Sequence, residues 1–335
     1  MGVRMKQQTI GSLVLLAALY WALTAPVKAD YSDRPEVLAF IAELTSSDGF
    51  EESELLHAFE QATYKQTIID AISRPAERVM TWASYQDIFL TKTRVDQGKA
   101  FEQQYRDSFD RAEAKWGVDR WVILAILGVE TSYGRNKGRY RVIDALSTLA
   151  FDYPPRSGFF RKELRELFLL AREQQKPVAA LLGSYAGAMG YGQFIPSSYR
   201  AYAVDFNGDA FIDIWNEPVD AVASIANYLA VHGWQKNEPI LAPMTASAAL
   251  PDDFFNQQLK PFLSLSELTN VGVALDEPLQ QWPALKAVPL YYEGKAGAET
   301  WLGFQNFYAI TRYNHSRLYA MAVFQLSEQL KAAAL

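Results

Sequence analysis

The stretch "WVILAILGVETSYG", residues 121–134, decides the fold and raises the first question about function. Its first nine residues, up to Val129, are apolar or small, and Glu130 is the first acid to follow. A helix that is apolar on every side is typical of one surrounded by other helices. Asp119, just ahead of the run, is of a residue type that caps helix starts. We therefore predict a helical core whose central helix ends in a single carboxyl group.

The position of Glu130 at the end of this helix has a chemical consequence. Removal from water disfavours the carboxylate anion, and the negative end of the helix dipole disfavours it as well. A carboxyl group that keeps its proton near neutral pH can act as a general acid. A simpler interpretation is that Glu130 marks the place where the helix reaches water, and this stretch by itself does not choose between the two.

The composition excludes several classes of function. The chain has 335 residues, 50% of them hydrophobic, which is enough to bury a large core. It contains no cysteine, which excludes disulfides, thiolate metal sites, cysteine nucleophiles and a lipid-modified cysteine. Its histidines, His57, His232 and His315, stand far apart and form no metal-binding motif. The net charge of -6 makes the chain a poor binder of nucleic acid.

Residues 1–29 have the pattern of a secretory signal peptide. Two basic residues precede an apolar run at 10–23, and the small residues Val27 and Ala29 stand where a cleavage site requires them. The apolar run is short for a membrane span of about 20 residues, although an N-terminal membrane anchor is the alternative. We expect cleavage after Ala29 and a soluble periplasmic protein that is not a lipoprotein.

The rest of the chain divides into four parts, and the expected fold class is mainly α (α+β). We expect an α-helical domain, a helical core, a small β-containing module and a return to the core, at residues 30–117, 118–237, 238–300 and 301–335. Frequent prolines and the short runs "VGVAL" and "AVPLYYEG" indicate strands in the third part.

Helical spacing predicts two buried stripes in the first of these parts, the second of which stops at Gly117. The stripes consist of Val37, Leu38, Ile41 and Leu44, and of Phe101, Tyr105, Phe109 and Ala112. Further helices are predicted at 119–131, 157–175 and 219–231.

A glycine-rich stretch follows the acid-bearing helix at residues 183–199, "GSYAGAMGYGQFIPSSY". Its four glycines would allow the backbone to approach a flat ligand closely, and its aromatics offer faces for sugar rings. Ser184 and Gln193 add hydrogen-bonding groups. The stretch lacks the lysine of a phosphate-binding loop and has no strand ahead of it. Small residues for close packing between helices are the competing explanation for the glycines.

The segment "DFNGDAFID", residues 205–213, has the oxygen spacing of a calcium-binding loop. It lacks the usual glycine at position 6 and an acid at position 12, so Glu217 or Asp220 would have to close the site. A plain polar turn is the alternative. The groups at positions 1, 3, 5 and 7 are Asp205, Asn207, Asp209 and the carbonyl of Phe211.

Near the C-terminus, "TRYNHSRLY", residues 311–319, contains Tyr313, Asn314 and Tyr319. These side chains would suit a sugar-binding cleft, because aromatic faces and amide groups are common in such sites. They would equally suit an ordinary junction between a loop and an amphipathic helix. The residues alone leave both interpretations open.

Taken in chain order, the motifs resemble the B-type lytic murein transglycosylases, family 103 of the glycoside hydrolases. They are "GVETSYG", "GSYAGAMGYGQFIPSSY", "DFNGDAFID", "ANYLAVHGW" and "RYNHS", and the resemblance is most specific over 129–234. It implies a lysozyme-like helical core, an additional α-helical domain and a small inserted β domain. It also implies cleavage of the bond between N-acetylmuramic acid and N-acetylglucosamine without water, which leaves a 1,6-anhydro end and serves cell-wall turnover.

The resemblance implies roles for individual residues as well. Glu130 matches the single catalytic acid and base, and Arg156 matches one of a pair of arginines, the second of which is Pro155 here. Further cleft positions are Ser184, Gln193, Tyr228, Tyr313, Asn314 and Tyr319. A structural calcium ion would be held by Asp205, Asn207, Asp209, Phe211 and Asp220. Catalysis would need no cofactor.

The expected partners are peptidoglycan glycan strands and proteins of cell-wall synthesis or remodelling, with the chain itself a monomer. Two rival functions stay open. A hydrolytic muramidase would combine the same acid with a second carboxylate that holds water, for which Asp144, Asp152 and Glu163 are candidates. A non-catalytic peptidoglycan-binding or scaffold protein is the other rival, although a binding protein has no use for a carboxyl group removed from water.

Overall fold

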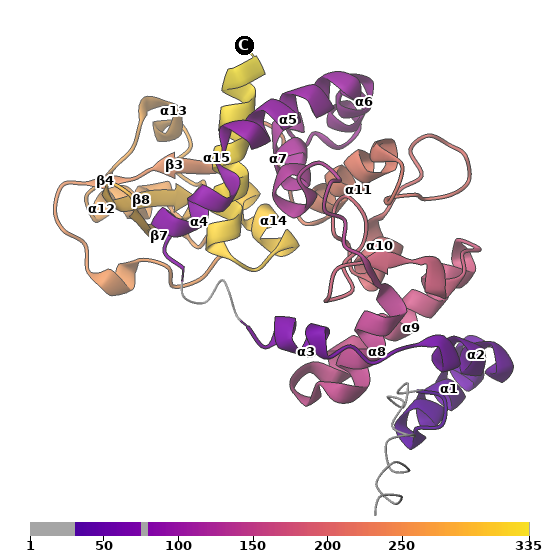
Figure 1. The fold of residues 1–335 in the computed structure, drawn as a ribbon. Helices are drawn as coiled ribbons and strands as arrows, with labels where there is room; N and C mark the ends of the chain where they lie inside the picture. Colours follow the sequence, from indigo (N-terminus) through magenta and orange to yellow (C-terminus); the bar gives the residue numbers. More distant parts are fainter. Residues whose placement is uncertain (1–30, 75–79, 335) are drawn as a thin grey trace, which may run out of the picture.

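The computed structural model describes residues 31–74 and 80–334, and the predicted signal peptide lies outside these residues. Figure 1 shows a mainly helical molecule, with a small β-containing part beside the long C-terminal helix. The expected mainly α class is confirmed. Within the described ranges, no helix is both long and apolar enough to cross a membrane.

Helices account for most of the ordered elements. In chain order they are α1 (Pro35–Asp48), α2 (Glu52–Gln61), α3 (Gln66–Ile72), α4 (Trp82–Phe89), α5 (Lys92–Gln104), α6 (Arg106–Trp116), α7 (Arg120–Thr131), α8 (Val142–Asp152), α9 (Ser157–Glu173), α10 (Pro196–Tyr202), α11 (Pro218–Val231), α12 (Leu265–Asn270), α13 (Glu277–Gln280), α14 (Gln305–Tyr313) and α15 (Arg317–Ala334). Short 3-10 turns lie at η2 (Pro154–Arg156), η3 (Val178–Ala180) and η4 (Asp252–Phe254).

The strands are short and mostly confined to one part of the chain. They are β1 (Tyr140–Arg141), β2 (Leu182–Gly183), β3 (Leu241–Pro243), β4 (Thr245–Ala246), β5 (Leu263–Ser264), β6 (Val273–Ala274), β7 (Lys286–Gly294) and β8 (Gly297–Gly303). An antiparallel sheet has the order β3-β8-β7-β5, β4 pairs with β6, and β1 pairs with β2. The run "AVPLYYEG" forms a strand as predicted, whereas only Val273 and Ala274 of "VGVAL" do so.

The first helices serve two different parts of the molecule. α3 packs on α8, whereas α4 contacts α15 and β7. α5 packs on α7 and α15, and α6 packs on α7 and α11. Figure 1 shows this separation, with α1 to α3 near α8 and α9, and α5 and α6 around α7. Residues 30–117 were expected to form one α-helical domain. In the structure, the helices α1 to α3 lie on the α8–α9 side, and α5 and α6 belong to the core around α7.

Two details of the predicted stripes need correction. Leu38 is 41% exposed, and Phe40 takes its place on the buried face of α1 beside Val37 and Ile41. The reason is that Leu38 lies about 100° around the helix from Val37, outside a stripe of spacing three and four. The second stripe is buried at Phe101 and Phe109, but the helix breaks between them at Tyr105 (φ -116°, ψ 25°) and continues as α6.

Candidate active site

α7 is built as its sequence predicts. The Asp119 carboxylate accepts a hydrogen bond from the Trp121 backbone amide at 2.8 Å, which caps the first turn. Every residue from Val122 to Gly128 is buried. α15 lies along this helix, and α5, α6 and α11 pack on it as well. Glu130, the only acid of this helix, is half-buried in its last turn and therefore lies at the edge of the core.

The chain turns sharply after Glu130. Ser132 and Tyr133 both have positive φ angles (52° and 59°), which few residues other than glycine adopt. Arg94 of α5 stabilises the turn, because its guanidinium donates to the Gly128 carbonyl at 3.0 Å and to the Ser132 hydroxyl at 3.2 Å. A cation here also offsets the negative end of the helix dipole. Arg94 was not predicted as a functional residue, because nothing in its local sequence indicates that it reaches the end of α7.

Glu130 meets a tyrosine from the far end of the chain. The Tyr319 hydroxyl donates a hydrogen bond to Glu130 Oε1 at 2.7 Å. Burial, and then the negative charge of Glu130, raise the pKa of Tyr319 well above its ordinary value, and the same two causes raise the pKa of Tyr313. Both phenols therefore stay protonated, and both lie within electrostatic reach of Glu130.

An aromatic cluster adjoins these phenols. The Tyr228 and Tyr313 rings meet edge to face at 4.8 Å, and Phe194 lies 5.7 and 5.8 Å from them. Tyr228 donates to the Arg312 carbonyl at 2.6 Å, and Tyr313 donates to the Gly192 carbonyl at 2.5 Å. The structure thus brings together the predicted residues Tyr228, Tyr313 and Tyr319. Phe194 was missed, although it directly follows Gln193 in the glycine-rich stretch.

The glycines of that stretch serve packing within the chain. A Cβ atom added at any of the four would lie 2.4 to 2.7 Å from an atom of the protein itself. The atoms met at Gly183, Gly187, Gly190 and Gly192 belong to Ala188, Leu146, Ile214 and Tyr313. The structure thus supports the packing explanation over close approach to a ligand.

Gln193 and Ser184 are both half-buried in this stretch. The Gln193 amide donates to the carbonyls of Lys137 (3.2 Å) and Gly190 (3.0 Å), and its own backbone has a positive φ of 51°. The Ser184 hydroxyl accepts from the Ala188 amide at 3.1 Å. Each side chain is therefore held in place by backbone groups.

Thr131 joins the stretch to α7. Its hydroxyl donates to the Tyr191 carbonyl at 2.9 Å, and the same hydroxyl accepts from the Gly134 amide at 2.9 Å. The residue after Glu130 is thereby tied to the glycine-rich stretch. These two bonds connect the backbone beside the acid to the loop that carries Gln193.

The other two predicted cleft residues differ in their surroundings. Asn314 ends α14 and accepts a hydrogen bond from the Ser316 amide at its carbonyl, 2.7 Å away, so it lies between Tyr313 and the start of α15. Arg156 is exposed at the start of α9, and its guanidinium lies over the rings of Phe159 (4.5 Å) and Phe160 (5.2 Å). The contacts of Arg156 thus place it on the α8–α9 side.

The candidate second carboxylates hold helices together. Asp144, 3% exposed, accepts from both Nε and Nη2 of Arg141 (2.9 and 2.7 Å) and from the Thr63 amide (2.9 Å). Asp152 accepts from Tyr31 (2.7 Å) and from two nitrogens of Arg34 (2.9 and 3.1 Å). Asp144 thereby joins α8 to β1 and to the segment after α2, and Asp152 joins α8 to the segment before α1.

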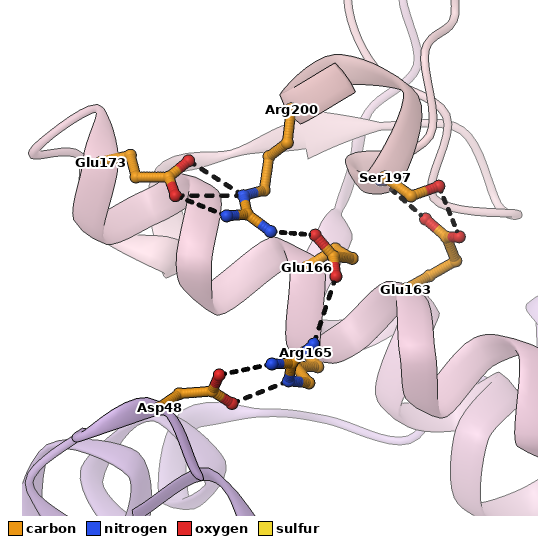
Figure 2. A network of polar contacts seen from close by, with 7 residues as sticks. All are labelled: Asp48, Glu163, Arg165, Glu166, Glu173, Ser197 and Arg200. Carbon is orange, nitrogen blue, oxygen red and sulfur yellow. Dashed lines mark hydrogen bonds and ion pairs between the residues drawn. The ribbon is translucent and has the colours of Figure 1, made fainter.

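Glu163 belongs to a second set of links, shown in Figure 2. Its two oxygens accept from the Ser197 amide (3.0 Å) and hydroxyl (2.7 Å) at the start of α10. Nearby, Asp48 of α1 pairs with Arg165 of α9, and Arg200 of α10 pairs with acids of α9. Burial raises the pKa of Glu163, and the two bonds from Ser197 oppose this. Each of the three candidate acids therefore accepts hydrogen bonds that link separate segments of the chain.

The acidic loop forms a compact set of turns. Asp205 accepts from the amides of Gly208 (2.6 Å) and Ala210 (2.9 Å), and Asp209 accepts from the Phe211 amide (2.9 Å). The Asn207 amide donates to Asp209 and to Glu217. Oxygen atoms gather here, but nowhere in residues 31–74 and 80–334 do three acidic or histidine side chains converge as a metal site would require.

Asp220, the residue that the resemblance implies as the last calcium ligand, is engaged by backbone groups. It is completely buried, and its two oxygens accept from the amides of Phe206 (2.8 Å) and Asp213 (2.9 Å), which joins both ends of the loop. Glu217, by contrast, faces Asn207 at 2.6 Å. Burial, and then the charges of Asp209 and Asp220, raise the pKa of Glu217. Of the two acids considered for closing the loop, Glu217 is the better placed.

Comparison with known proteins gives concordant results. Residues 32–328 match the family model described as "Transglycosylase SLT domain". The chain is 38% identical over 314 residues to membrane-bound lytic murein transglycosylase B of Escherichia coli (strain K12), which covers 91% of this chain and 85% of the relative.

Solved structures agree with this match. The catenated lytic transglycosylase SltB1 of Pseudomonas aeruginosa has a TM-score of 0.87 and 47% identity, over 91% of this chain and 99% of that one. The Escherichia coli lytic transglycosylase Slt35 in complex with calcium has a TM-score of 0.82 and 39% identity, over 91% of this chain and 95% of that one.

Proposed function

This chain belongs to the transglycosylase SLT domain family and is a lytic murein transglycosylase, and from that premise we propose that Glu130 is its catalytic acid and base. The observation that carries the proposal is the hydrogen bond from Tyr319 to Glu130 Oε1. It joins two motifs that are 189 residues apart in the sequence, at the end of the apolar helix.

The reaction uses one carboxyl group in two steps. Glu130 first gives its proton to the glycosidic oxygen, so that the bond from N-acetylmuramic acid to the next N-acetylglucosamine breaks and the latter leaves with a 4-hydroxyl group. The 2-acetamido group of the muramic acid can occupy the anomeric carbon in between, as in substrate-assisted enzymes. The Glu130 carboxylate then removes the proton from the sugar's own 6-hydroxyl, whose oxygen closes the 1,6-anhydro ring. Glu130 ends protonated, as it began.

Tyr319 has a positioning function in this scheme. Its pKa is raised, so its hydroxyl remains a donor throughout the cycle. A hydrogen bond to the carboxylate stabilises the charged form that exists between the two steps. The same bond fixes the rotation of the carboxyl group. A catalytic group that is already oriented lowers the entropic part of the activation barrier.

We propose that the aromatic cluster and its neighbours bind the glycan. Tyr313, half-buried and within electrostatic reach of Glu130, packs against the buried rings of Tyr228 and Phe194, and aromatic rings suit the faces of sugars. Gln193, Ser184 and Asn314 would add hydrogen bonds. The partners that already hold Gln193 and Ser184 favour this function, because a fixed side chain loses less entropy on binding. Arg156 would contact the substrate only beyond this cluster.

The mass of the products tests the proposed reaction. Purified peptidoglycan is digested with the enzyme, and the soluble products are measured by mass spectrometry beside those of a lysozyme. We expect muramic acid ends that are lighter by one water and resist borohydride reduction. Ordinary reducing ends would contradict the proposal and would identify a hydrolase. The engagement of Asp144, Asp152 and Glu163 in structural contacts favours the anhydro product.

We propose further that the acidic loop binds a structural calcium ion. Its ligands would be Asp205, Asn207, Asp209, the carbonyl of Phe211 and Glu217, all of them oxygen donors that calcium prefers. The raised pKa of Glu217 supports this, because neighbouring acids destabilise its charge and a cation would remove that cost. A related enzyme of known structure is a calcium complex. Catalysis as written above involves no metal.

Melting curves test the loop. Calcium that binds only the folded protein raises the melting temperature. We expect millimolar calcium to raise it for the unmodified chain and to leave an Asp209→Asn variant unaffected, with magnesium as the ionic-strength control. An unchanged melting curve in calcium would identify the loop as a plain turn.

Export to the periplasm is the last part of the proposal. Residues 1–29 carry the signal-peptide pattern, and the substrate of this enzyme lies outside the cytoplasmic membrane. N-terminal sequencing of the protein from fractionated cells should return Asp30 as the first residue, from the soluble periplasmic fraction. Recovery of Met1 from a membrane pellet would contradict cleavage.

A further inference from the structure

A cavity of about 470 Å³ lies beside the candidate active site, on the side of the β-containing part. One wall is the turn between α14 and α15, at His315, Ser316 and Arg317. The rest of its lining consists of Leu318, Asn256, Gln258, Leu259 and Leu290 of β7. Asn314, expected to contact the glycan, directly precedes this turn. The cavity is therefore next to the candidate active site, but none of the proposed glycan-binding residues lines it.

The ionisable groups at this cavity are all basic. His315 and Arg317 line it, no acidic residue does, and Arg312 stands one turn earlier on α14. Within the described part of the chain, Arg312 and Arg317 form no ion pair and instead lie over the rings of Tyr308 and Tyr292. Unbalanced positive charge is unexpected in a chain with 38 acidic and 32 basic residues. It indicates a ligand that carries negative charge.

The backbone that carries these cations is held from both sides. Tyr228 donates to the Arg312 carbonyl at 2.6 Å, and Tyr292, 1% exposed, donates to the Arg317 carbonyl at 3.1 Å. The Ser316 hydroxyl accepts from the Tyr319 amide at 3.3 Å. A site whose backbone is fixed before binding loses less entropy when its ligand arrives. The turn is therefore prepared for a ligand.

Three leucines form the apolar part of the lining. Leu290 and Leu318 are 0% and 7% exposed, and Leu259 beside them is half-buried. A ligand that fills the cavity would place small apolar groups against these leucines and a negative group against Arg317. A short peptide of small residues with a free carboxylate has that combination, and its amide groups would suit Asn256 and Gln258, which also line the cavity.

We propose that this cavity binds a carboxylate of the stem peptide that the muramic acid of peptidoglycan carries. The inference rests on the proposed function, because it takes the substrate strand as the ligand. Arg317 would pair with the carboxylate, and the leucines would contact alanine-sized side chains. Arg317 and Tyr319 stand in the same first turn of α15, so one turn serves both the peptide and Glu130. The muramic acid's own lactyl carboxylate is the other source of the same chemistry.

Binding to an inactive protein tests this directly. The Glu130→Gln chain is titrated calorimetrically, at low salt, with the disaccharide pentapeptide of peptidoglycan. The same titration is made with that pentapeptide after amidation of its carboxylates and with the disaccharide that has a free lactyl group and no peptide. Arg317→Gln is added to this background. The control is Lys162→Gln, which removes an exposed positive charge on α9. At neutral pH Arg317 is the group to change, because burial lowers the pKa of His315.

Arg317→Gln should weaken binding of the pentapeptide about tenfold or more, the effect of a lost charge-assisted hydrogen bond. It should leave the affinity for the amidated and peptide-free ligands unchanged, and Lys162→Gln should change none of them. Equal weakening for the peptide-free disaccharide would overturn the peptide assignment in favour of the lactyl group. No difference between the two variants would overturn the site altogether. Because no turnover is needed, either failure is distinct from a failure of the wild-type chain to release anhydro products.

Discussion

The C-terminal end of α7 and the α8–α9 side hold carboxyl groups in two different ways. On α8, Asp144 and Asp152 accept hydrogen bonds from arginines, and on α9 Glu163 accepts them from the start of α10. At the end of α7, Glu130 accepts one from the neutral phenol of Tyr319. An arginine strongly favours the carboxylate anion, whereas a phenol orients the group and favours the anion less. A cationic partner thus distinguishes the two acids of α8 from Glu130, whereas Glu163 has neutral donors as Glu130 does and differs from it in joining α9 to α10.

The largest effect is expected at Glu130. Glu130→Gln keeps the shape and accepts the Tyr319 hydrogen bond but has no proton to give. General acid or base catalysis contributes about 10²–10⁴-fold, and one group acts in both steps here, so turnover of peptidoglycan should fall by about 10⁴-fold. Melting temperature and binding of glycan should change little. Near-normal turnover by this variant would mean that Glu130 is not the catalytic acid, and the contrast with the acids of α8 and α9 would then have no functional meaning.

A smaller loss of activity is expected at Tyr319. Tyr319→Phe removes the hydroxyl that holds Glu130, and a hydrogen bond to a charged group is worth about 1.5–3 kcal/mol. The turnover number should therefore fall about 10- to 100-fold, with little change in KM. Tyr199→Phe is the matched control, because it removes another buried hydroxyl, which donates to the Ile212 carbonyl at 2.6 Å. If both variants lose the same activity, the Tyr319 contact is structural.

Asp144→Asn should affect stability and leave catalysis intact. The substitution breaks the pair with Arg141, whose side chain is 31% exposed, and weakens the bond from the Thr63 amide. Loss of one partner of a fully buried pair costs about 3–5 kcal/mol, and the exposure of Arg141 should reduce this to about 2 kcal/mol in the free energy of unfolding. Urea denaturation measures the loss. A strong drop in the turnover number of the folded variant would make Asp144 a reaction partner and revive the hydrolytic mechanism.

The smallest effect is expected at Glu163. Burial raises the pKa of Glu163, so the folded chain binds a proton on this carboxyl group more tightly than the unfolded chain does. An unperturbed glutamate has a pKa of about 4.3. The contribution of Glu163 to stability therefore falls as the pH rises from that value through its raised pKa. Glu163→Gln removes this dependence. The variant should lose about 1 kcal/mol or less at pH 7 and lose more, relative to the unmodified chain, at pH 4. A larger loss at pH 7 than at pH 4 would show that the Ser197 bonds outweigh burial.

Local rules predicted much of the helical structure. The apolar run at 121–129 predicted a buried helix, Asp119 its cap, and Gly117 the end of the helix before it, and the structure confirms all three. They hold because helix periodicity, capping and a left-handed terminal glycine depend on neighbours within one or two turns. The break at Tyr105 was not predicted, because both halves of the stripe remain at helical spacing and only packing against different helices separates them.

By itself, the sequence determined that one acid ends an apolar helix and that a glycine-rich stretch, an acidic loop and a tyrosine-bearing turn follow it. The tertiary structure alone decided which carboxyl group meets which partner. Tyr319 reaches Glu130, Arg34 and Tyr31 reach Asp152, and Ser197 reaches Glu163 from 34 to 189 positions away. The tertiary structure also decided that the four glycines pack against the chain itself and that the basic turn borders a cavity. The physical reason is that a side chain's hydrogen bonds and burial depend on groups brought near it by folding, and periodicity along the chain carries no record of them.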